Sequence, residues 1–359
     1  MSNKFLSSPN FKLILLTAMV LQNSSTVLVG RYTRSSVKVE ELYAVDAIIM
    51  SAEIGKLVLS CVLEHFTTNG QLIPSIRANI IEQPHDALKI MIPALLYLVQ
   101  NSLLYVALSN LTAPVFQVTY QTKLVTTAVV SVMMLNRKYN FQQWICLVVL
   151  SLGVAIVVLG ESSSSQPKVI TGEQSLTVGL VSVTISCLSS ALAGVYFEKV
   201  VKTASGEKQR PVSVWMRNIQ LAFFTICLAL VQSIFKGDFT SADSKSYLHG
   251  FTFWVWVLVL LQSAGGLLVA AIIKYADNVL KGLATGVSVC FATGVSTVLF
   301  GTPLKQQFVL GAGMILGSVY VFSNPISFKK SFDTATVTET DPKIAKNESN
   351  DEMEPILPR

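Results

Sequence analysis

The sequence predicts an all-α integral membrane protein in which ten transmembrane helices form two inverted five-helix repeats. Hydrophobic residues make up 51% of the 359 residues and charged residues only 13%, with a mean hydropathy of +0.55. Soluble domains carry about 25% charged residues, so this chain lacks the polar surface of a globule of its length. Long apolar segments and a match between the two halves of the chain supply the other evidence.

Ten segments are long and apolar enough to cross the hydrocarbon core of a bilayer, which takes about 20 residues of helix. They lie at roughly 11–30, 43–65, 87–108, 112–135, 141–159, 175–198, 212–235, 252–274, 278–300 and 306–323. The first segment is too polar for a signal peptide and is poorly followed by a small-residue cleavage site. We therefore expect it to remain as a spanning helix.

Basic residues in the connections predict the orientation of the helices, because cytoplasmic loops carry an excess of lysine and arginine. With the N-terminus in the cytoplasm, 14 of the 27 basic residues lie on the cytoplasmic side and 7 on the opposite side. The others lie within helices or in the distal tail. Both termini are therefore expected to be cytoplasmic.

The two halves of the chain match without gaps at an offset of 164 residues. Residues 140–144 (NFQQW) align with 304–308 (LKQQF), and Gly153 aligns with Gly317. The same offset places the third predicted helix on the eighth and the fourth on the ninth. Because five helices is an odd number, the second half must enter the membrane in the opposite direction, as in transporters with a central site between inverted repeats.

These elements divide the chain into four parts. We expect a first five-helix repeat at 1–160, a flexible linker at 161–174, a second inverted repeat at 175–326 and a disordered cytoplasmic tail at 327–359. The linker holds a run of four serines, and the tail is rich in acidic residues and poor in apolar ones.

Composition also excludes several classes of function. The net charge of +6 is scattered between apolar segments and forms no basic stripe, so no nucleic acid is expected as a partner. The five cysteines and three histidines are widely separated, which argues against disulfides and a metal site. An enzyme at the membrane midplane would need paired acid and base groups, and the sequence offers no such cluster.

The fourth segment contains a single charged residue, Lys123, close to its middle. An ionised lysine at the bilayer centre costs about 2.5–3.5 kcal/mol even on insertion scales, so Lys123 must face a polar interior. Aromatic and hydroxyl side chains share its helical face: Phe116, Thr119, Tyr120 and Thr127. An ammonium group in such a cavity suits a phosphate and a stacked base. An ion pair with Glu53 in the second segment is the alternative.

Polar residues in other segments are further candidates. Tyr97, Gln100 and Asn101 in the third segment offer donors and acceptors suited to a pyrimidine edge, with interhelical hydrogen bonding as the alternative. Ser189 belongs to a stripe of small residues that is more typical of helix packing. Arg217 opens the seventh segment beside Asn218, and we expect the arginine to extend to the membrane interface.

Four polar residues cluster at the junction of the eighth and ninth segments: Lys274, Asp277, Asn278 and Lys281. Position leaves two interpretations open. They are either cytoplasmic charges of the positive-inside pattern, or a phosphate clamp that complements Lys123 from the other half of the chain.

Several runs of sequence resemble signatures of Golgi nucleotide-sugar transporters. The runs are LVQNSLLYVALSNL (98–111), FQVTYQTK (116–123), AGVYFEK (193–199), WMRNIQ (215–220), GGLLVA (265–270) and KYADNVLKG (274–282). They cover the third to tenth segments in order. The family groups transporters of CMP-sialic acid, UDP-galactose and UDP-N-acetylglucosamine.

The resemblance implies a ten-helix drug/metabolite-transporter fold in the Golgi membrane that exchanges a nucleotide sugar for a nucleoside monophosphate, without a cofactor. By motif position, the nucleotide contacts of the family fall on Tyr97, Asn101, Tyr120, Lys123, Ser189, Asn218 and Lys274. The run 222–224 (AFF) resembles the UDP-galactose and UDP-N-acetylglucosamine branch, for which UMP would be the exchanged nucleotide. Thr122 and Ser102 depart from the usual family residues.

Three questions stay open at this stage. The sequence does not separate galactose from N-acetylglucosamine, and a homodimer is among the alternatives for the oligomeric state. A proton-coupled exporter of another phosphorylated or nucleotide metabolite is the alternative function, because Glu53 and Asp46 place carboxylates in the second segment.

Overall fold

The computed structural model describes residues 9–35, 42–162, 175–203, 212–236, 248–300 and 305–324. These residues form helices and connecting turns, and no β-strand occurs among them. The predicted tail at 327–359 lies outside the described residues, as does the predicted linker from 163 onwards. The predicted division of the chain at these two segments therefore stays a prediction.

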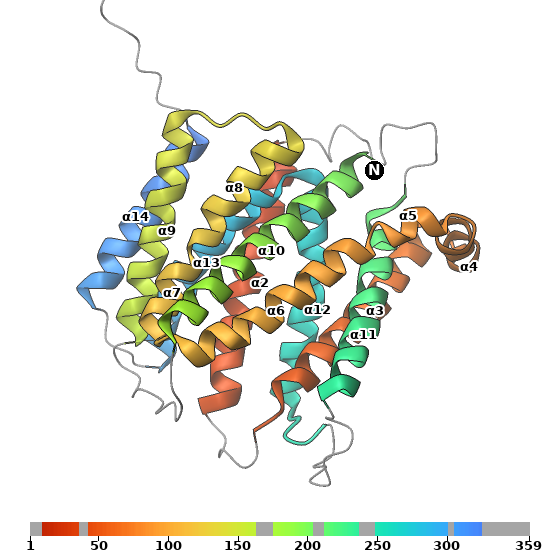
Figure 1. The fold of residues 1–359 in the computed structure, drawn as a ribbon, viewed down its shortest axis with the longest axis horizontal. Helices are drawn as coiled ribbons and strands as arrows, with labels where there is room; N and C mark the ends of the chain where they lie inside the picture. The colour runs from red at the N-terminus through yellow and green to blue at the C-terminus, as the bar shows by residue number, and fades with distance from the viewer. Residues whose placement is uncertain are drawn as a thin grey trace, which may run out of the picture. The chain divides into compact units, whose positions relative to one another are not determined.

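Every one of the ten predicted segments is helical (Figure 1). The long helices are α2 (Pro9–Ser35), α3 (Val45–Thr67), α6 (Met91–Asn110), α9 (Phe141–Ser162), α10 (Leu176–Thr203), α11 (Val214–Lys236), α12 (Phe253–Tyr275), α13 (Asn278–Phe300) and α14 (Gln306–Ser323). The fourth predicted segment is divided at Gln121 into α7 (Ala113–Tyr120) and α8 (Thr122–Leu135). Three short helices connect α3 to α6: α4 (Leu72–Ile76), the π-helix η2 (Arg77–Ile81) and α5 (Pro84–Leu88).

Nine helical stretches of the described residues are long and apolar enough to cross a membrane, with α7 and α8 counted together. The helix α3 is not among them, because every 18-residue stretch of it carries three charged residues. The chain is thus an all-helical integral membrane protein. A tenth span through α3 remains a prediction.

The outer surface of the helices is apolar. Met133, Phe141, Val298 and Tyr320 are between 69% and 82% exposed, and many other large apolar side chains are exposed as well. Soluble monomers rarely expose large apolar surfaces. In a bilayer, lipid tails cover such side chains, which agrees with the composition of the helices.

The helices α9 and α14, which correspond in the internal match, pack antiparallel (Figure 1). Gln142 at the start of α9 donates from Nε2 to the carbonyl oxygen of Val321 near the end of α14, at 2.8 Å. Lys305 just before α14 donates to the carbonyl oxygen of Gly160 near the end of α9, at 2.9 Å. The matched segments therefore run past each other in opposite directions.

Close approach of α9 and α14 depends on glycine. A Cβ atom added to Gly153 would lie 3.0 Å from the carbonyl oxygen of Gly311, and one added to Gly311 would lie 2.7 Å from the carbonyl oxygen of Gly153. Gly317, which the sequence match aligns with Gly153, has open space where its Cβ would be. The glycine contact thus joins Gly153 to Gly311.

The helix α10 lies in the interior and contacts α6, α7, α8, α12 and α13. Its small residues allow these neighbours to approach: Ser186, Ala191 and Gly194 are all buried. Ser186 also donates a hydrogen bond to the carbonyl oxygen of Gln100 in α6, at 3.1 Å. The face of α10 toward α8 and α13 borders the cavity described below.

We predict that Gly153→Ala lowers thermal stability, because the new methyl group has no space between α9 and α14. Overpacking of this kind costs about 1–3 kcal/mol. Gly317→Ala is the matched control, since it adds the same methyl group on the paired helix in open space. Thermal unfolding of purified protein in detergent measures both. Equal melting temperatures for the two variants would contradict the close contact.

Candidate functional site

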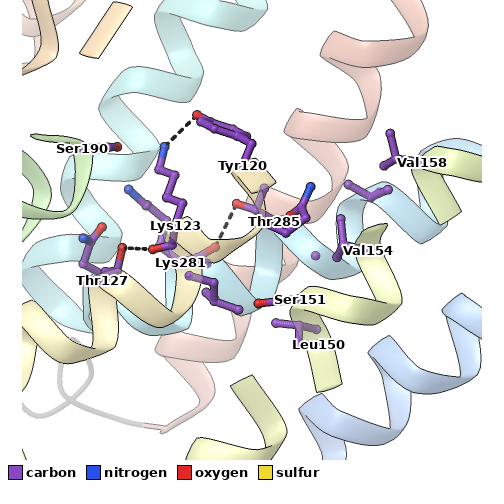
Figure 2. Close-up of a pocket in the computed structure, with 16 residues that line it drawn as sticks. Tyr120, Lys123, Thr127, Leu150, Ser151, Val154, Val158, Ser190, Lys281 and Thr285 are labelled. Atoms are coloured by element: carbon purple, nitrogen blue, oxygen red, sulfur yellow. Dashed lines mark hydrogen bonds between the residues drawn. The ribbon is translucent and has the colours of Figure 1, made fainter. Parts of the chain in front are cut away.

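A cavity of about 290 Å³ lies between α8, α9 and α13, with one residue of α7 and one of α10 at its margin (Figure 2). Its polar lining comes from both halves of the chain: Tyr120, Gln121, Lys123, Thr127, Ser151, Ser190, Asn278, Lys281 and Thr285. The apolar lining includes Leu150, Val154 and Val158 of α9. An apolar wall with a few convergent polar groups is the usual form of a small-molecule site.

Lys123 extends from the first turn of α8 toward the last residue of α7. Its Nζ donates to the hydroxyl oxygen of Tyr120 at 3.2 Å and lies 5.3 Å from the centre of the tyrosine ring. The division of the helix at Gln121 separates these two residues. Phe116 stacks on Tyr120 with the ring centres 5.6 Å apart, so the phenol is supported from the α7 side.

A second lysine, Lys281, lines the same cavity from the first turn of α13. Neither lysine forms an ion pair with any carboxylate in the part of the chain that the structure describes. An ammonium group in an apolar span is costly to leave without a counter-charge. Two of them at one cavity create a site that favours an anion.

Glu53 pairs with Lys56 on its own helix, with Oε2 and Nζ 2.5 Å apart. The alternative ion pair between Glu53 and Lys123 is therefore not formed in this structure. Gly266 of α12 makes room for Lys56, because a Cβ atom there would lie 2.6 Å from Lys56 Cδ. Sequence reasoning missed Lys56, although a spacing of three residues on a helix is the signal of such a pair.

The structure divides the remaining predicted site residues between different places. Tyr97 and Asn101 line a second cavity of about 310 Å³ between α3, α6 and α11, together with Asp46, Ser102 and Gln232. Other candidates line neither of these two cavities: Glu53, Gln100, Phe116, Ser189, Asn218 and Lys274. Predicted residues of α8 and α13 are thus brought together, whereas those of α6 lie apart from them.

Arg217 does not extend to the membrane interface as predicted. It is 1% exposed, and its guanidinium pairs with the Asp86 carboxylate of α5 at 2.6 Å. It also donates to Gln220 Oε1 at 3.0 Å. The partner at Asp86 lies in a short connecting helix that the hydropathy pattern does not reveal, which is why the sequence favoured snorkelling. Arg217 instead fixes α11 to α5.

Sequence reasoning also missed two buried carboxylates. Glu64 at the end of α3 is 2% exposed and accepts hydrogen bonds from the hydroxyls of Ser75 and Ser213. Glu198 of α10 is fully buried and pairs with Arg137 and Lys202. Glu198 lies within the run 193–199, so its occurrence in a signature motif was the available signal. Among the described residues, no cluster of histidine, cysteine and acidic side chains could hold a metal ion.

Comparison with known proteins gives the family. The family model described as nucleotide-sugar transporter matches residues 7–323. This chain belongs to the nucleotide-sugar transporter family. It is therefore a membrane transporter rather than an enzyme.

Several curated relatives cover most of the chain. A UDP-galactose translocator of Mus musculus is 42% identical over 331 residues, which are 91% of this chain and 82% of the relative. A UDP-galactose/UDP-N-acetylglucosamine transporter of Caenorhabditis elegans is 38% identical, with 89% of this chain and 84% of the relative covered. A UDP-N-acetylglucosamine transporter of Canis lupus familiaris is 38% identical, with 88% and 94% covered.

A solved crystal structure supports the fold. It is 11% identical to this transporter with a TM-score of 0.62, and the match covers 88% of this chain and 97% of the other. At this identity the similarity extends to the arrangement of helices alone.

We predict that Arg217→Gln destabilises this transporter, because the Asp86 carboxylate loses its buried partner and Gln220 loses a donor. Loss of a hydrogen bond to a charged group costs about 1.5–3 kcal/mol. Lys89→Gln is the matched control, since Lys89 pairs with the same carboxylate from the surface at 3.3 Å and is 57% exposed. An exposed pair contributes about 0–1 kcal/mol. If Arg217 instead extended to the membrane interface, Arg217→Gln and Lys89→Gln would have the same melting temperature.

Proposed function

We propose that this transporter exchanges UDP-galactose, UDP-N-acetylglucosamine or both for UMP across the Golgi membrane, with both termini in the cytoplasm. The observation that carries the proposal is the pair of lysines, Lys123 and Lys281, that face one cavity without carboxylate partners among the described residues. A UDP-sugar brings two phosphates to such a site. The substrates in the names of the relatives support a UDP-sugar as the ligand.

The lysines suit phosphate for a chemical reason. A lysine ammonium is a compact point charge with three donors, and it binds phosphate without a fixed geometry. Leu150 and Val154 form an apolar wall of the cavity, and opposite charges attract each other more strongly in such surroundings than in bulk water. Tyr120 holds Lys123 at the edge of the cavity through its hydroxyl, so the ammonium group is positioned before a ligand arrives.

The two cavities are proposed to act together. Ligand sites for drug-sized molecules occupy about 300–1,000 Å³, and each cavity lies near the lower end of that range. A nucleotide sugar is too large to fit fully into either cavity alone. We therefore propose that Lys123 and Lys281 bind the phosphates while Tyr97 and Asn101 bind the nucleoside, in a state in which the intervening helices have moved.

Alternating access through two inverted repeats is the proposed mechanism. The antiparallel contact of α9 with α14 supports this arrangement, because matched helices of inverted repeats run in opposite directions. Exchange follows from charge. A site with two lysines changes from one side of the membrane to the other more readily when a bound anion neutralises it. After the nucleotide sugar has been released on one side, binding of UMP there therefore permits the return step.

We predict that purified protein in liposomes takes up UDP-galactose or UDP-N-acetylglucosamine faster when UMP is loaded inside. Radiolabelled uptake measures this, with empty liposomes as the reference. The same measurement separates the alternative function. A proton-coupled exporter, with Asp46 as the carboxylate that lines the second cavity, would respond to a proton gradient and not to UMP.

The variant Lys123→Met removes the charge and keeps the stem, so it should abolish the stimulation by UMP while the protein still folds. Lys199→Met is the matched control, because Lys199 is exposed on α10 and lines neither cavity. Equal rates from empty and UMP-loaded liposomes for the parent protein would contradict the proposed exchange.

A further inference from the structure

The buried carboxylate of Glu198 in α10 contacts its own helix and two other elements with its two oxygens. Oε1 accepts hydrogen bonds from the Arg137 guanidinium at 2.6 Å and from Lys202 Nζ at 2.7 Å. Oε2 accepts a hydrogen bond from the backbone N–H of Asn278 at 3.0 Å. The side chain is fully buried, whereas Arg137 and Lys202 are 29% and 32% exposed. Oε1 therefore binds the two cationic side chains, and Oε2 binds the backbone at the start of α13.

The charged groups around Oε1 join the turn between α8 and α9 to the turn between α12 and α13. Arg137 pairs with Asp277 at 3.0 Å as well as with Glu198. Lys202 donates to the carbonyl oxygen of Ala276 at 2.6 Å. Burial opposes the charge of Arg137, but Asp277 and Glu198 outweigh it and raise the pKa of the guanidinium. The network has no net charge, and it connects the ends of α8, α10 and α12. We call this end of the helices the Glu198 end.

The start of α13 is fixed by two residues on one face of α10. Gly194 and Glu198 are four residues apart, so they lie on the same side of the helix. A Cβ atom added to Gly194 would lie 2.4 Å from Asn278 Nδ2, so any larger residue here would force this amide to shift. Glu198 holds the backbone of the same asparagine.

Asn278 lines the cavity with Lys123 and Lys281, although it is only 3% exposed. Its Oδ1 atom is buried and has no hydrogen-bond partner in the part of the chain that the structure describes. A buried amide oxygen without a partner is destabilising, because it has lost its hydrogen bonds to water. An N–H or O–H group of a bound ligand would satisfy it.

We propose that Glu198 is a positioning residue with two tasks, in which Oε2 holds Asn278 at the cavity and Oε1 closes the Glu198 end through Arg137 and Lys202. The first task rests on the proposed function, because it assumes that the cavity binds the nucleotide. The second task does not. Access to the cavity from the Glu198 end requires the contacts of Oε1 to break. Because Oε2 of the same carboxylate holds Asn278, opening at this end is coupled to the position of Asn278 in the cavity.

Three variants separate the two tasks. Glu198→Gln keeps an oxygen that can accept the Asn278 N–H but removes the charge that holds Arg137 and Lys202. Gly194→Ala pushes against the Asn278 amide and leaves the ion pairs in place. Glu82→Gln is the control, because this carboxylate is 59% exposed and pairs with Arg77 outside the network.

Closure is measured by a cysteine at Ser190, which lines the cavity and is 5% exposed (Figure 2). Ser190→Cys is placed in a background whose five native cysteines are replaced. A membrane-impermeant thiol reagent is then applied to either side of oriented vesicles. Binding of UMP to the same proteins is measured separately by titration.

Glu198→Gln should raise labelling from the Glu198 end about tenfold, within the 5–150-fold range of typical coupling between sites, with labelling from the other side unchanged. Gly194→Ala should weaken UMP binding about tenfold through overpacking, more than Glu198→Gln does, and leave labelling at the parent rate. Glu82→Gln should match the parent in both measurements.

If Glu198→Gln is labelled at the parent rate, Oε1 does not close the Glu198 end. An equal rise in labelling from both sides would also overturn this task, because it indicates that the whole helix bundle has loosened. UMP binding that is weakened more by Glu198→Gln than by Gly194→Ala would overturn the separation of tasks between the two oxygens. A parent protein that fails to bind UMP contradicts the proposed function and with it the first task, and the labelling still decides the second.

Discussion

Two lysine side chains that lack a carboxylate partner in the described residues, Lys123 and Lys281, set the constraint on which the proposed site depends. Each belongs to an apolar span, where placing an ionised lysine at the bilayer centre costs about 2.5–3.5 kcal/mol even on insertion scales. Both face one cavity, so mutual repulsion adds to the loss of hydration. A bound anion relieves both costs at once. This is why we propose a phosphate-bearing ligand for the cavity.

Several other charged residues of the bundle have a partner of opposite charge inside the protein. Glu53 pairs with Lys56, and Arg217 pairs with Asp86. Arg137, Glu198, Asp277 and Lys202 form a neutral network next to the start of α13. That network borders the lysine cavity through Asn278, which belongs to both. The charges in these contacts are therefore paired, whereas Lys123 and Lys281 have no carboxylate partner among the described residues.

Much of this arrangement was predictable from the sequence, because hydropathy over about 20 residues is a local property. All ten predicted segments are helical, and Lys123 was recognised because a lone charge in an apolar span needs a reason. Partners distant in sequence were not predictable. Arg217 was misread because Asp86 lies 131 residues away, and the second cavity at Tyr97 was not foreseen because helix packing decides which polar faces meet.

The most direct test of the account compares UMP with uridine as ligands of the purified transporter. The two differ by the phosphate, so the ratio of their dissociation constants isolates what the lysines contribute. We predict that UMP binds at least about tenfold more tightly, as expected for a charge-assisted contact of 1.5–3 kcal/mol, and that the preference disappears in Lys123→Met/Lys281→Met. Equal affinities in the parent protein, or a preference for UMP that survives removal of both lysines, would show that this cavity does not bind the phosphate.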